Sequence, residues 1–246
     1  MEAYRTSERD FLTLLDNIGS TRDLFVPTVG QGNITYQRWN ELDQPSIQFP
    51  KSRIGTPPKV FFFPPKESVA SFGSEDKVEP ERSKRAIFGL KSCDLMSLRV
   101  LDEIFLDEEI VDPFYAIRRH DTLLISSDCY DIADGCFCNK VGGGPYPTEG
   151  FDINVTKLPD LEELIVEFNG DSLKAQKILE ENSELFQPAT ETMLEKRNSF
   201  RVSRDEELED LNSYFDVPDN VAEVPINNPI WRKYAEDCIE CGACNL

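Results

Sequence analysis

The sequence has one histidine, fewer cations than anions and no long apolar run. A lone imidazole, His120, excludes sites that need several histidines, such as His-rich zinc or haem sites. The chain has 26 Lys and Arg residues and 46 Asp and Glu residues, and the net charge of −20 repels phosphate backbones and anionic membrane surfaces. The longest apolar runs, such as 60–63, are far too short to cross a bilayer, and the charged residues 1–10 form no secretory signal. We therefore expect a cytoplasmic protein that neither binds nucleic acid nor inserts into a membrane.

The 246 residues are enough for one large domain, or for one domain with an appendage. Hydrophobic residues make up 39% of the chain, with 16 Phe among them, so a sizeable packed core can form and a wholly disordered chain is excluded. The stretch 225–229 begins and ends with proline and has the composition of a linker. We therefore predict an α/β domain over 1–224, and a linker with a short cysteine motif over 225–246.

Apolar spacing predicts several elements along the chain. A helix is expected from Ser7 to Gly19, and a short strand at 60–63, where two prolines stop it. A charged surface loop is expected at 71–84. Further helical segments are predicted at 161–186, at 203–212 and at 231–235.

The most informative pattern begins at residue 85. Residues 85–90 have the pattern of a buried strand, a helix follows from about Leu95 with Asp94 as its predicted N-cap, and 121–126 form a second strand. Strand, helix and strand make a βαβ unit, so the two strands are predicted to be parallel with a right-handed crossover. The sequence therefore predicts an α/β or α+β fold with a mixed sheet that contains this unit.

Four cysteines are expected to meet at one edge of this sheet. Cys93 and Cys129 follow the two strands, and parallel strands point their carboxyl ends to the same edge, where α/β proteins place ligands. Cys136 and Cys138, two residues apart in a segment predicted to be extended, would project to one face. Four cysteines suit one [4Fe–4S] cluster or one tetrahedral zinc ion, and the start of the following helix favours anionic thiolates.

Three interpretations of these four cysteines stay open at this point: an iron–sulfur cluster, a zinc site, and ordinary buried thiols. Zinc sites usually use paired C-x2-C knuckles, and a C-x-C segment with two scattered partners fits that pattern poorly. We therefore favour a [4Fe–4S] cluster held by Cys93, Cys129, Cys136 and Cys138.

A second group of cysteines ends the sequence, where Cys238, Cys241 and Cys244 have the spacing C-x2-C-x2-C. This spacing opens the bacterial ferredoxin run C-x2-C-x2-C-x3-C-P, and the small residues Gly242 and Ala243 let the backbone approach the sulfurs. Three cysteines imply a ligand from elsewhere, a three-iron cluster, or a chain that stops inside a longer module, and we favour the last. We therefore expect the start of a ferredoxin-like module, with a second [4Fe–4S] cluster only if a fourth ligand is supplied.

Two other features carry less weight. Residues 142–144 are three glycines without the frame of a phosphate-binding loop, so a turn is expected. Residues 118–120, Arg-Arg-His, are expected to lie in a solvated loop. No spacing singles out a pair of carboxylates for acid–base chemistry.

Nine short segments, in order along the chain, match one protein family. They are Val60–Glu67, Phe88–Asp94, Leu101–Asp102, Asp112–Tyr115, Asp128–Cys129, Cys136–Cys138, Gly144–Pro145, Gly150–Asp152 and Trp231–Cys244. In these segments the chain resembles the family of sulfhydrogenase beta subunits and anaerobic sulfite reductase A subunits, the 4Fe–4S dicluster-containing proteins. The resemblance extends from about Pro57 to the end, and the ordered set makes it specific.

The resemblance implies an iron–sulfur electron-transfer subunit of a multi-subunit anaerobic oxidoreductase, such as a hydrogenase or a sulfite reductase, rather than a catalyst on its own. Such a subunit passes electrons between a flavin-containing subunit that oxidises a nucleotide and a catalytic redox subunit. Family members continue into a ferredoxin-like module with two clusters, whereas this sequence stops after the third cysteine of the first run. The alternatives are a zinc-stabilised structural or interaction module without a redox role, and a catalytic subunit with a substrate site near 142–150.

Overall fold

The chain divides into two compact units, Met1–Asn212 and Ser213–Leu246. The computed structural model describes residues 2–30, 33–43, 49, 54–68, 82–107, 109, 111–214, 225, 227–236 and 238. Most of the loop predicted at 71–84 lies outside the described residues. The division at 224 that the sequence indicates stays a prediction.

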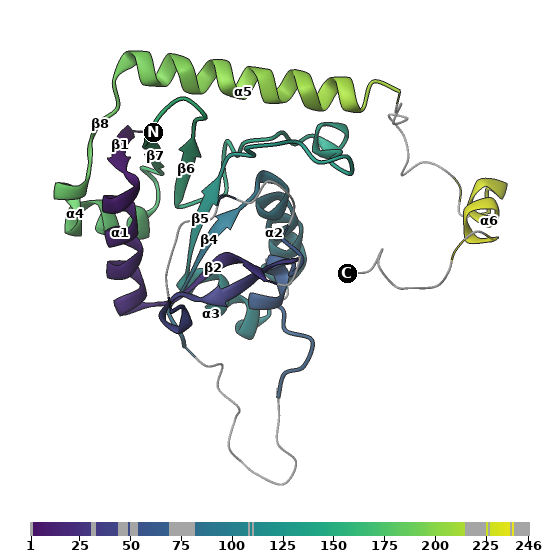
Figure 1. Ribbon diagram of the computed structural model, residues 1–246. Coiled ribbons are helices and arrows are strands. Elements are labelled where there is room, and N and C mark those ends of the chain that lie inside the picture. The colour runs from purple at the N-terminus through teal and green to yellow at the C-terminus, as the bar shows by residue number, and fades with distance from the viewer. Residues whose placement is uncertain are drawn as a thin grey trace, which may run out of the picture. The chain divides into compact units, whose positions relative to one another are not determined.

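The described part of the first unit is built on a mixed eight-stranded sheet (Figure 1). The strands are β1 (Glu2–Ser7), β2 (Asp23–Gly30), β3 (Asn33–Arg38), β4 (Arg85–Leu90), β5 (Thr122–Ser127), β6 (Ile153–Lys157), β7 (Glu163–Phe168) and β8 (Gln187–Pro188). Their order in the sheet is β3-β2-β4-β5-β6-β7-β1-β8. β2, β4, β5 and β6 are parallel neighbours, and the remaining pairs are antiparallel. The predicted mixed α/β sheet is therefore confirmed.

Helices connect the strands and cover the sheet. The α-helices are α1 (Glu8–Thr21), α2 (Ser92–Phe105), α3 (Pro113–Asp121), α4 (Leu173–Glu181), α5 (Glu191–Leu211) and α6 (Pro229–Glu236). The 3-10 helices are η1 (Trp39–Glu41), η2 (Pro58–Phe61), η3 (Cys138–Val141) and η4 (Ser183–Leu185). All of these except α6 lie in the first unit. Within the described ranges, no helix combines the length and the apolar character that crossing a bilayer requires.

Both faces of the sheet are buried, and alternate residues of the central strands point into different cores. On one face Ala86 of β4 belongs to a core with Leu14 of α1 and with residues of α4. On the other face Ile87 of β4 packs with Leu98 of α2 and with residues of α3. β7 continues this second face, where Ile165 packs against α5. Strands that are buried on both faces have continuous apolar sequences, as β4 and β5 do.

The predicted βαβ unit is present, with β4 and β5 parallel. Its helix differs in detail, because α2 begins at Ser92 and its N-cap is Lys91 rather than Asp94. The Asp94 carboxylate lies within the first turn, where it accepts a hydrogen bond of 2.8 Å from the backbone N–H of Lys91. This contact satisfies the donor just outside the helix and moves the helix start three residues earlier than expected. Cys93 is therefore a residue of the first helical turn.

Two other predicted elements are wrong. Residues 58–61 form the 3-10 helix η2 instead of the strand expected at 60–63. Pro58 has no N–H for a strand ladder, and Phe62 is fully buried just after this helix. The segment 161–186 contains β7 before α4, because the run Leu-Ile-Val of β7 is buried on both faces and lacks the alternation of a half-exposed strand.

The boundaries of the other helices are close to the predictions. α1 has Ser7 as its N-cap, as expected, but continues through Gly19 to Thr21. Gly19 is buried there against the ring of Trp39, so it provides room for packing and does not end the helix. α5 ends near the predicted position but begins at Glu191, twelve residues before 203. The short helix expected at 231–235 is present as α6.

The basic residues 118–120 lie in the last turn of α3, so the prediction of a loop is wrong for all three, and the prediction of solvation is wrong for two of them. Arg118 donates to the carbonyl of Phe62 and pairs with Glu67. Arg119 binds both carboxylate oxygens of Asp102 at 3.0–3.1 Å. These contacts tie α3 to α2 and to the segment after η2, and His120 alone is exposed to solvent.

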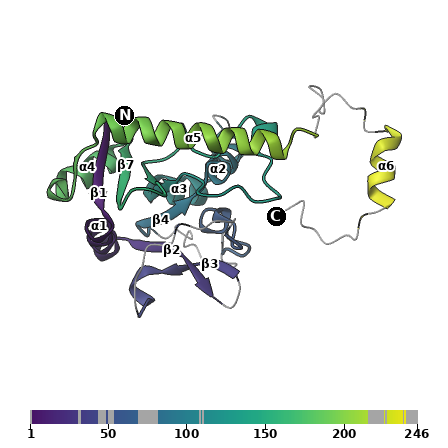
Figure 2. The ribbon, with the colours of Figure 1, turned by 45° about the horizontal axis from the view of Figure 1, so that its top comes forward.

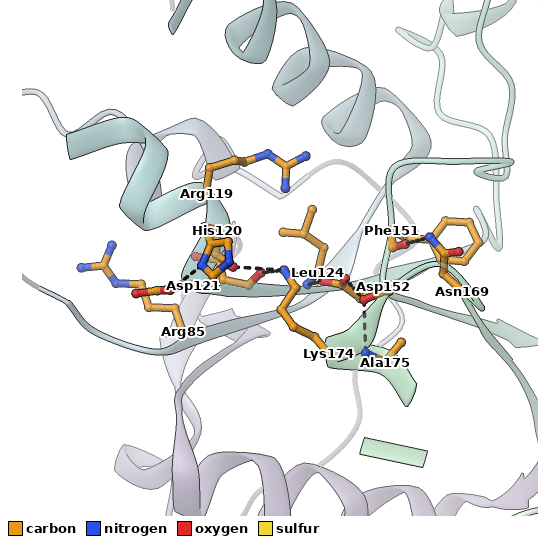
Figure 3. Close-up of polar contacts among 12 residues, drawn as sticks. Arg85, Arg119, His120, Asp121, Leu124, Phe151, Asp152, Asn169, Lys174 and Ala175 are labelled. Carbon is orange, nitrogen blue, oxygen red and sulfur yellow. Dashed lines mark hydrogen bonds and ion pairs between the residues drawn. The ribbon is translucent and has the colours of Figure 1, made fainter. Parts of the chain in front are cut away.

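A polar cluster at the amino end of β5 anchors α4 to the sheet (Figure 3). The buried carboxylate of Asp152 accepts hydrogen bonds from the backbone N–H of Leu124 at 2.7 Å and from the hydroxyl of Ser172 at 2.5 Å. The Lys174 ammonium lies 3.2 Å from the same carboxylate and donates to the carbonyl of Thr122. Burial lowers the pKa of Lys174, and the charge of Asp152 opposes that shift.

Asp152→Ala is expected to lower the free energy of unfolding by about 2–4 kcal/mol, because it leaves a backbone N–H without its acceptor and removes the anion that pairs with a partly buried ammonium. Denaturant unfolding followed by circular dichroism measures the change. The exposed Asp171 is a control from the same region, and Asp171→Ala should have little effect. Equal stability of the two variants would contradict the anchoring role.

Candidate functional site

β4 ends in an irregularity that determines where its cysteine lies. The pairing of β4 with β5 shifts register at Gly89, whose φ is +85°. A Cβ at this position would lie 2.9 Å from Cγ of Pro27, so both the backbone conformation and the neighbour require glycine. The chain then reaches Lys91 and enters α2, and Cys93 lies in the first turn.

The other three cysteines follow β5. Cys129 lies two residues beyond the strand, and its backbone N–H donates to the carbonyl of Pro145 at 2.7 Å. The loop between them, 130–144, turns back before Cys136, whose N–H donates to the carbonyl of Ala133 at 2.8 Å. Cys138 begins η3, so the segment 136–138 is not extended, and that expectation is wrong. The expected glycine turn is present at Gly142, whose φ of +81° ends η3.

Cys93, Cys129, Cys136 and Cys138 line one cavity of about 380 Å³. Each of the four side chains is half-buried. The cavity lies at the carboxyl edge of the parallel strands β4 and β5, between the start of α2 and the loop after β5. Its other lining residues are Lys91, Met96, Ser97, Val100, Asp131, Ala133, Gly135, Phe137, Val141 and Gly144.

The arrangement of the four thiols bears on the kind of metal group that they could bind. Among the residues that the structure describes, no three or more His, Cys, Asp or Glu side chains are close enough together to hold a metal ion. The four cysteines thus surround a cavity and do not form a closed tetrahedron around a point. Any group bound by all four must fill part of that cavity or draw the sulfurs inward.

A buried cation faces the same cavity. Lys91 is 5% exposed, and its ammonium donates to the hydroxyl of Ser127 at 3.0 Å and to the carbonyl of Asp128 at 3.1 Å. Both acceptors are uncharged, and a buried ammonium is stable only where negative charge compensates it. The cavity into which Lys91 projects is therefore suited to an anionic occupant. No sequence motif marks Lys91, although its place between a buried strand and Cys93 was a usable signal.

The thiol of Cys129 is protonated at neutral pH in the chain without a bound group. Burial raises its pKa to about 11, the charge of Lys91 lowers it, and Cys138 and Cys136 raise it further. Because burial raises the pKa of Cys129 more than the ammonium lowers it, the thiolate requires a stronger positive centre than Lys91 alone. A metal-containing group would provide one, since it binds thiolates and releases their protons.

A buried ionic network holds Asp128, the residue before Cys129. Its carboxylate accepts from Arg201 of α5 at 2.8 Å and from the hydroxyl of Thr156 at 2.8 Å. Arg201 also pairs with Glu167 at 2.5 Å, and Asn154 donates to both carboxylates. These contacts join β5, β6, β7 and α5 immediately beside the cavity. No periodicity or spacing in the sequence predicts them.

The last turns of α5 hold the loop that carries the cysteines, and both ribbon views show this helix beside the loop (Figures 1 and 2). Asn212, which follows the last residue of α5, donates to the carbonyl of Cys136 at 3.0 Å and to Asn139 at 2.9 Å. Glu209 accepts from Asn139 at 2.8 Å and from Lys140 at 3.4 Å. The shape of the loop therefore depends on a helix some seventy residues further along the chain.

A second, more polar cavity of about 620 Å³ lies next to the first and shares Met96 and Gly144 with it. It includes residues 142–144 and 146–150, where a substrate site is the alternative hypothesis. Four of its charged side chains form two ion pairs, Arg99 with Glu149 at 3.1 Å and Arg119 with Asp102, and Asp205 accepts a hydrogen bond from the hydroxyl of Tyr146. This internal pairing leaves no charge pattern that selects a substrate class.

Of the terminal motif, the structure describes only Cys238, which is exposed. Cys241 and Cys244 lie outside the described residues. α6 precedes the motif, and the indole N–H of Trp231 donates to the carbonyl of Pro225 at 2.9 Å. The ligand set at the terminal cysteines therefore stays a prediction.

Comparison with known proteins agrees with the family resemblance. The chain is similar to the beta subunit of sulfhydrogenase 2 of Pyrococcus furiosus, with 26% identity over 238 residues. The match covers 96% of this chain and 67% of the relative. No model of a protein family matches the chain. The similarity over almost the whole chain confirms the resemblance to sulfhydrogenase beta subunits.

The raised pKa of Cys129 predicts slow alkylation in the cluster-free chain. With a pKa of about 11, about one thousandth of this thiol is ionised at pH 8, and its rate with iodoacetamide should rise about tenfold per pH unit up to pH 11. Lys91→Met should slow the reaction further, because the ammonium lowers this pKa. Mass spectrometry of labelled peptides measures each rate. A pH-independent rate at Cys129, or no change in Lys91→Met, would contradict this description.

Proposed function

We propose that this chain is an iron–sulfur electron-transfer subunit of a multi-subunit anaerobic oxidoreductase. It would pass electrons between a flavin-containing subunit and a catalytic redox subunit, and its similarity to a sulfhydrogenase beta subunit supports this assignment. The observation that carries the proposal is the meeting of four cysteines from separate segments at one cavity with a buried lysine.

The donor set suits a [4Fe–4S] cluster. Cys93, Cys129, Cys136 and Cys138 supply the four thiolates that such a cluster takes, and the cavity of about 380 Å³ offers more room than one metal ion needs. A cubane is wider than a single ion and keeps its ligands further apart. The room between the four cysteines is therefore compatible with the cluster.

When bound, the cluster supplies a carrier for one electron at a time. The chain's own residues set its surroundings. The Lys91 ammonium would compensate the negative charge of the bound cluster from the protein side of the cavity. The apolar side chains of Met96 and Val100 form part of the cavity wall and limit the access of water. Burial, charge and hydrogen bonds to the sulfurs are the means by which a protein sets a reduction potential.

The terminal cysteines are the second part of the proposal. Cys238, Cys241 and Cys244 would contribute to another [4Fe–4S] cluster when a fourth ligand completes the set. The relative is longer than this chain, since the match covers 67% of it. The inner site needs no such ligand, because its four cysteines all lie in the first unit.

Anaerobic purification tests the function directly. The chain should be brown and contain about four iron and four acid-labile sulfide per inner site, and the dithionite-reduced protein should show an electron paramagnetic resonance (EPR) signal. Cys138→Ser should remove the signal of the inner cluster, whereas Cys238→Ser, the matched control, should keep it. A colourless chain with stoichiometric zinc, or an unchanged signal in Cys138→Ser, would contradict the proposal.

Lys91 has its own test. Lys91→Met should lower the midpoint potential of the inner cluster, because a nearby cation stabilises the more negative reduced state. Lys91→Arg keeps the charge and should stay close to the wild type. Redox titration followed by EPR measures both potentials. A Lys91→Met variant with full iron content and the wild-type potential would show that the ammonium does not act on the cluster.

A further inference from the structure

The mouth of the cysteine cavity is rimmed by exposed apolar side chains. Val100, Phe137 and Val141 all line the cavity, and they are 56%, 53% and 55% exposed. Val100 comes from α2, whereas the other two come from the loop after β5. Ile104, 60% exposed, extends the apolar surface by one turn of α2. We call the first three residues the apolar rim.

This arrangement differs from the scattered apolar residues of an ordinary surface. Single exposed apolar side chains are normal, but a contiguous group around an opening is typical of an interaction site. The rest of α2 is amphipathic in the usual way, with Leu95 and Leu98 buried on the sheet side. The apolar character of the rim is therefore not required by the core.

The charges of the loop that carries two of the rim residues, and of the half of α5 that holds this loop, are mainly negative. The loop 129–144 contains two Asp and one Lys, and the half of α5 that holds it, 202–211, contains five carboxylates and one Arg. The single lysine, Lys140, contacts Glu209 of that helix. Asp134 is exposed in the turn next to the rim, and Asp131 lines the cavity itself. An approaching protein thus meets an apolar centre with an acidic surround.

We propose that the apolar rim is the docking surface for the protein that exchanges electrons with the inner site. The partner carries an apolar patch bordered by lysines and arginines, which complements both the rim and its acidic surround. This inference rests on the proposed function, and it places the exchange at the cavity mouth, where the path between the inner cysteines and a bound partner is short.

Cytochrome c, a basic protein, is a suitable probe of this surface. The dithionite-reduced chain is mixed with ferric cytochrome c, each haem iron takes one electron, and stopped-flow absorbance follows its reduction. A Phe137→Ser/Val141→Ser double variant should lower the second-order rate about tenfold. Asp134→Lys should lower it at low salt and less so at high salt. Leu173→Ser and Asp171→Lys, at exposed positions of the α4 region, are the matched controls and should leave the rate unchanged.

Two further measurements separate the possible outcomes. The iron content and EPR spectrum of every variant should match those of the wild type, so that a slower reaction reports docking. Rim variants with normal spectra and unchanged rates would overturn the docking surface and leave the proposed function intact. A wild-type chain without a cluster would overturn both. Light scattering that shows a dimer, separated into monomers by the rim substitutions, would assign the rim to a second copy of this chain and would also overturn the proposal.

Discussion

The parallel pairing of β4 and β5 is the constraint on which the candidate site depends. Because the two strands end at the same edge of the sheet, Lys91 and Cys93 after one strand lie near Asp128 and Cys129 after the other. One inner cysteine follows β4 and the other three follow β5. The site therefore exists only in the folded sheet, and the apolar layers that bury both faces of the strands supply the free energy that keeps the four cysteines around one cavity.

The charged side chains near this edge of the sheet differ in how their charge is compensated. The carboxylates of Asp128 and Glu167 are neutralised by Arg201 and its neighbour Arg197, so the anions behind the cavity are satisfied within the protein. The ammonium of Lys91, by contrast, donates to neutral oxygens and projects toward the cysteines. In the part of the chain that the structure describes, a buried ammonium with neutral hydrogen-bond acceptors thus lies beside the four cysteines, whereas the cations behind the cavity are paired with carboxylates. That asymmetry distinguishes the site from an ordinary group of buried cysteines.

Much of the sheet and of the cysteine group could be predicted from the sequence, because periodicity and strand direction are local signals. Residues 85–90 and 121–126 read as strands from their own side chains, and the parallel geometry follows from the helix between them. β7 could not be distinguished from a helix, since burial on both faces removes the alternation that identifies a strand. The contacts of Arg201 and Asn212 could not be predicted either, because they join residues about seventy positions apart and produce no periodic pattern in the sequence. The early start of α2 depended on a single backbone-to-carboxylate hydrogen bond at Asp94.

Asn212 is the final residue of the first unit, and its side-chain amide donates a hydrogen bond to the backbone carbonyl of Cys136. The same amide also donates to Asn139 of the cysteine loop and to the carbonyl of Leu208 in α5. A substitution at the end of the first unit can therefore reach the loop that carries a candidate ligand, although Asn212 does not itself line the cavity.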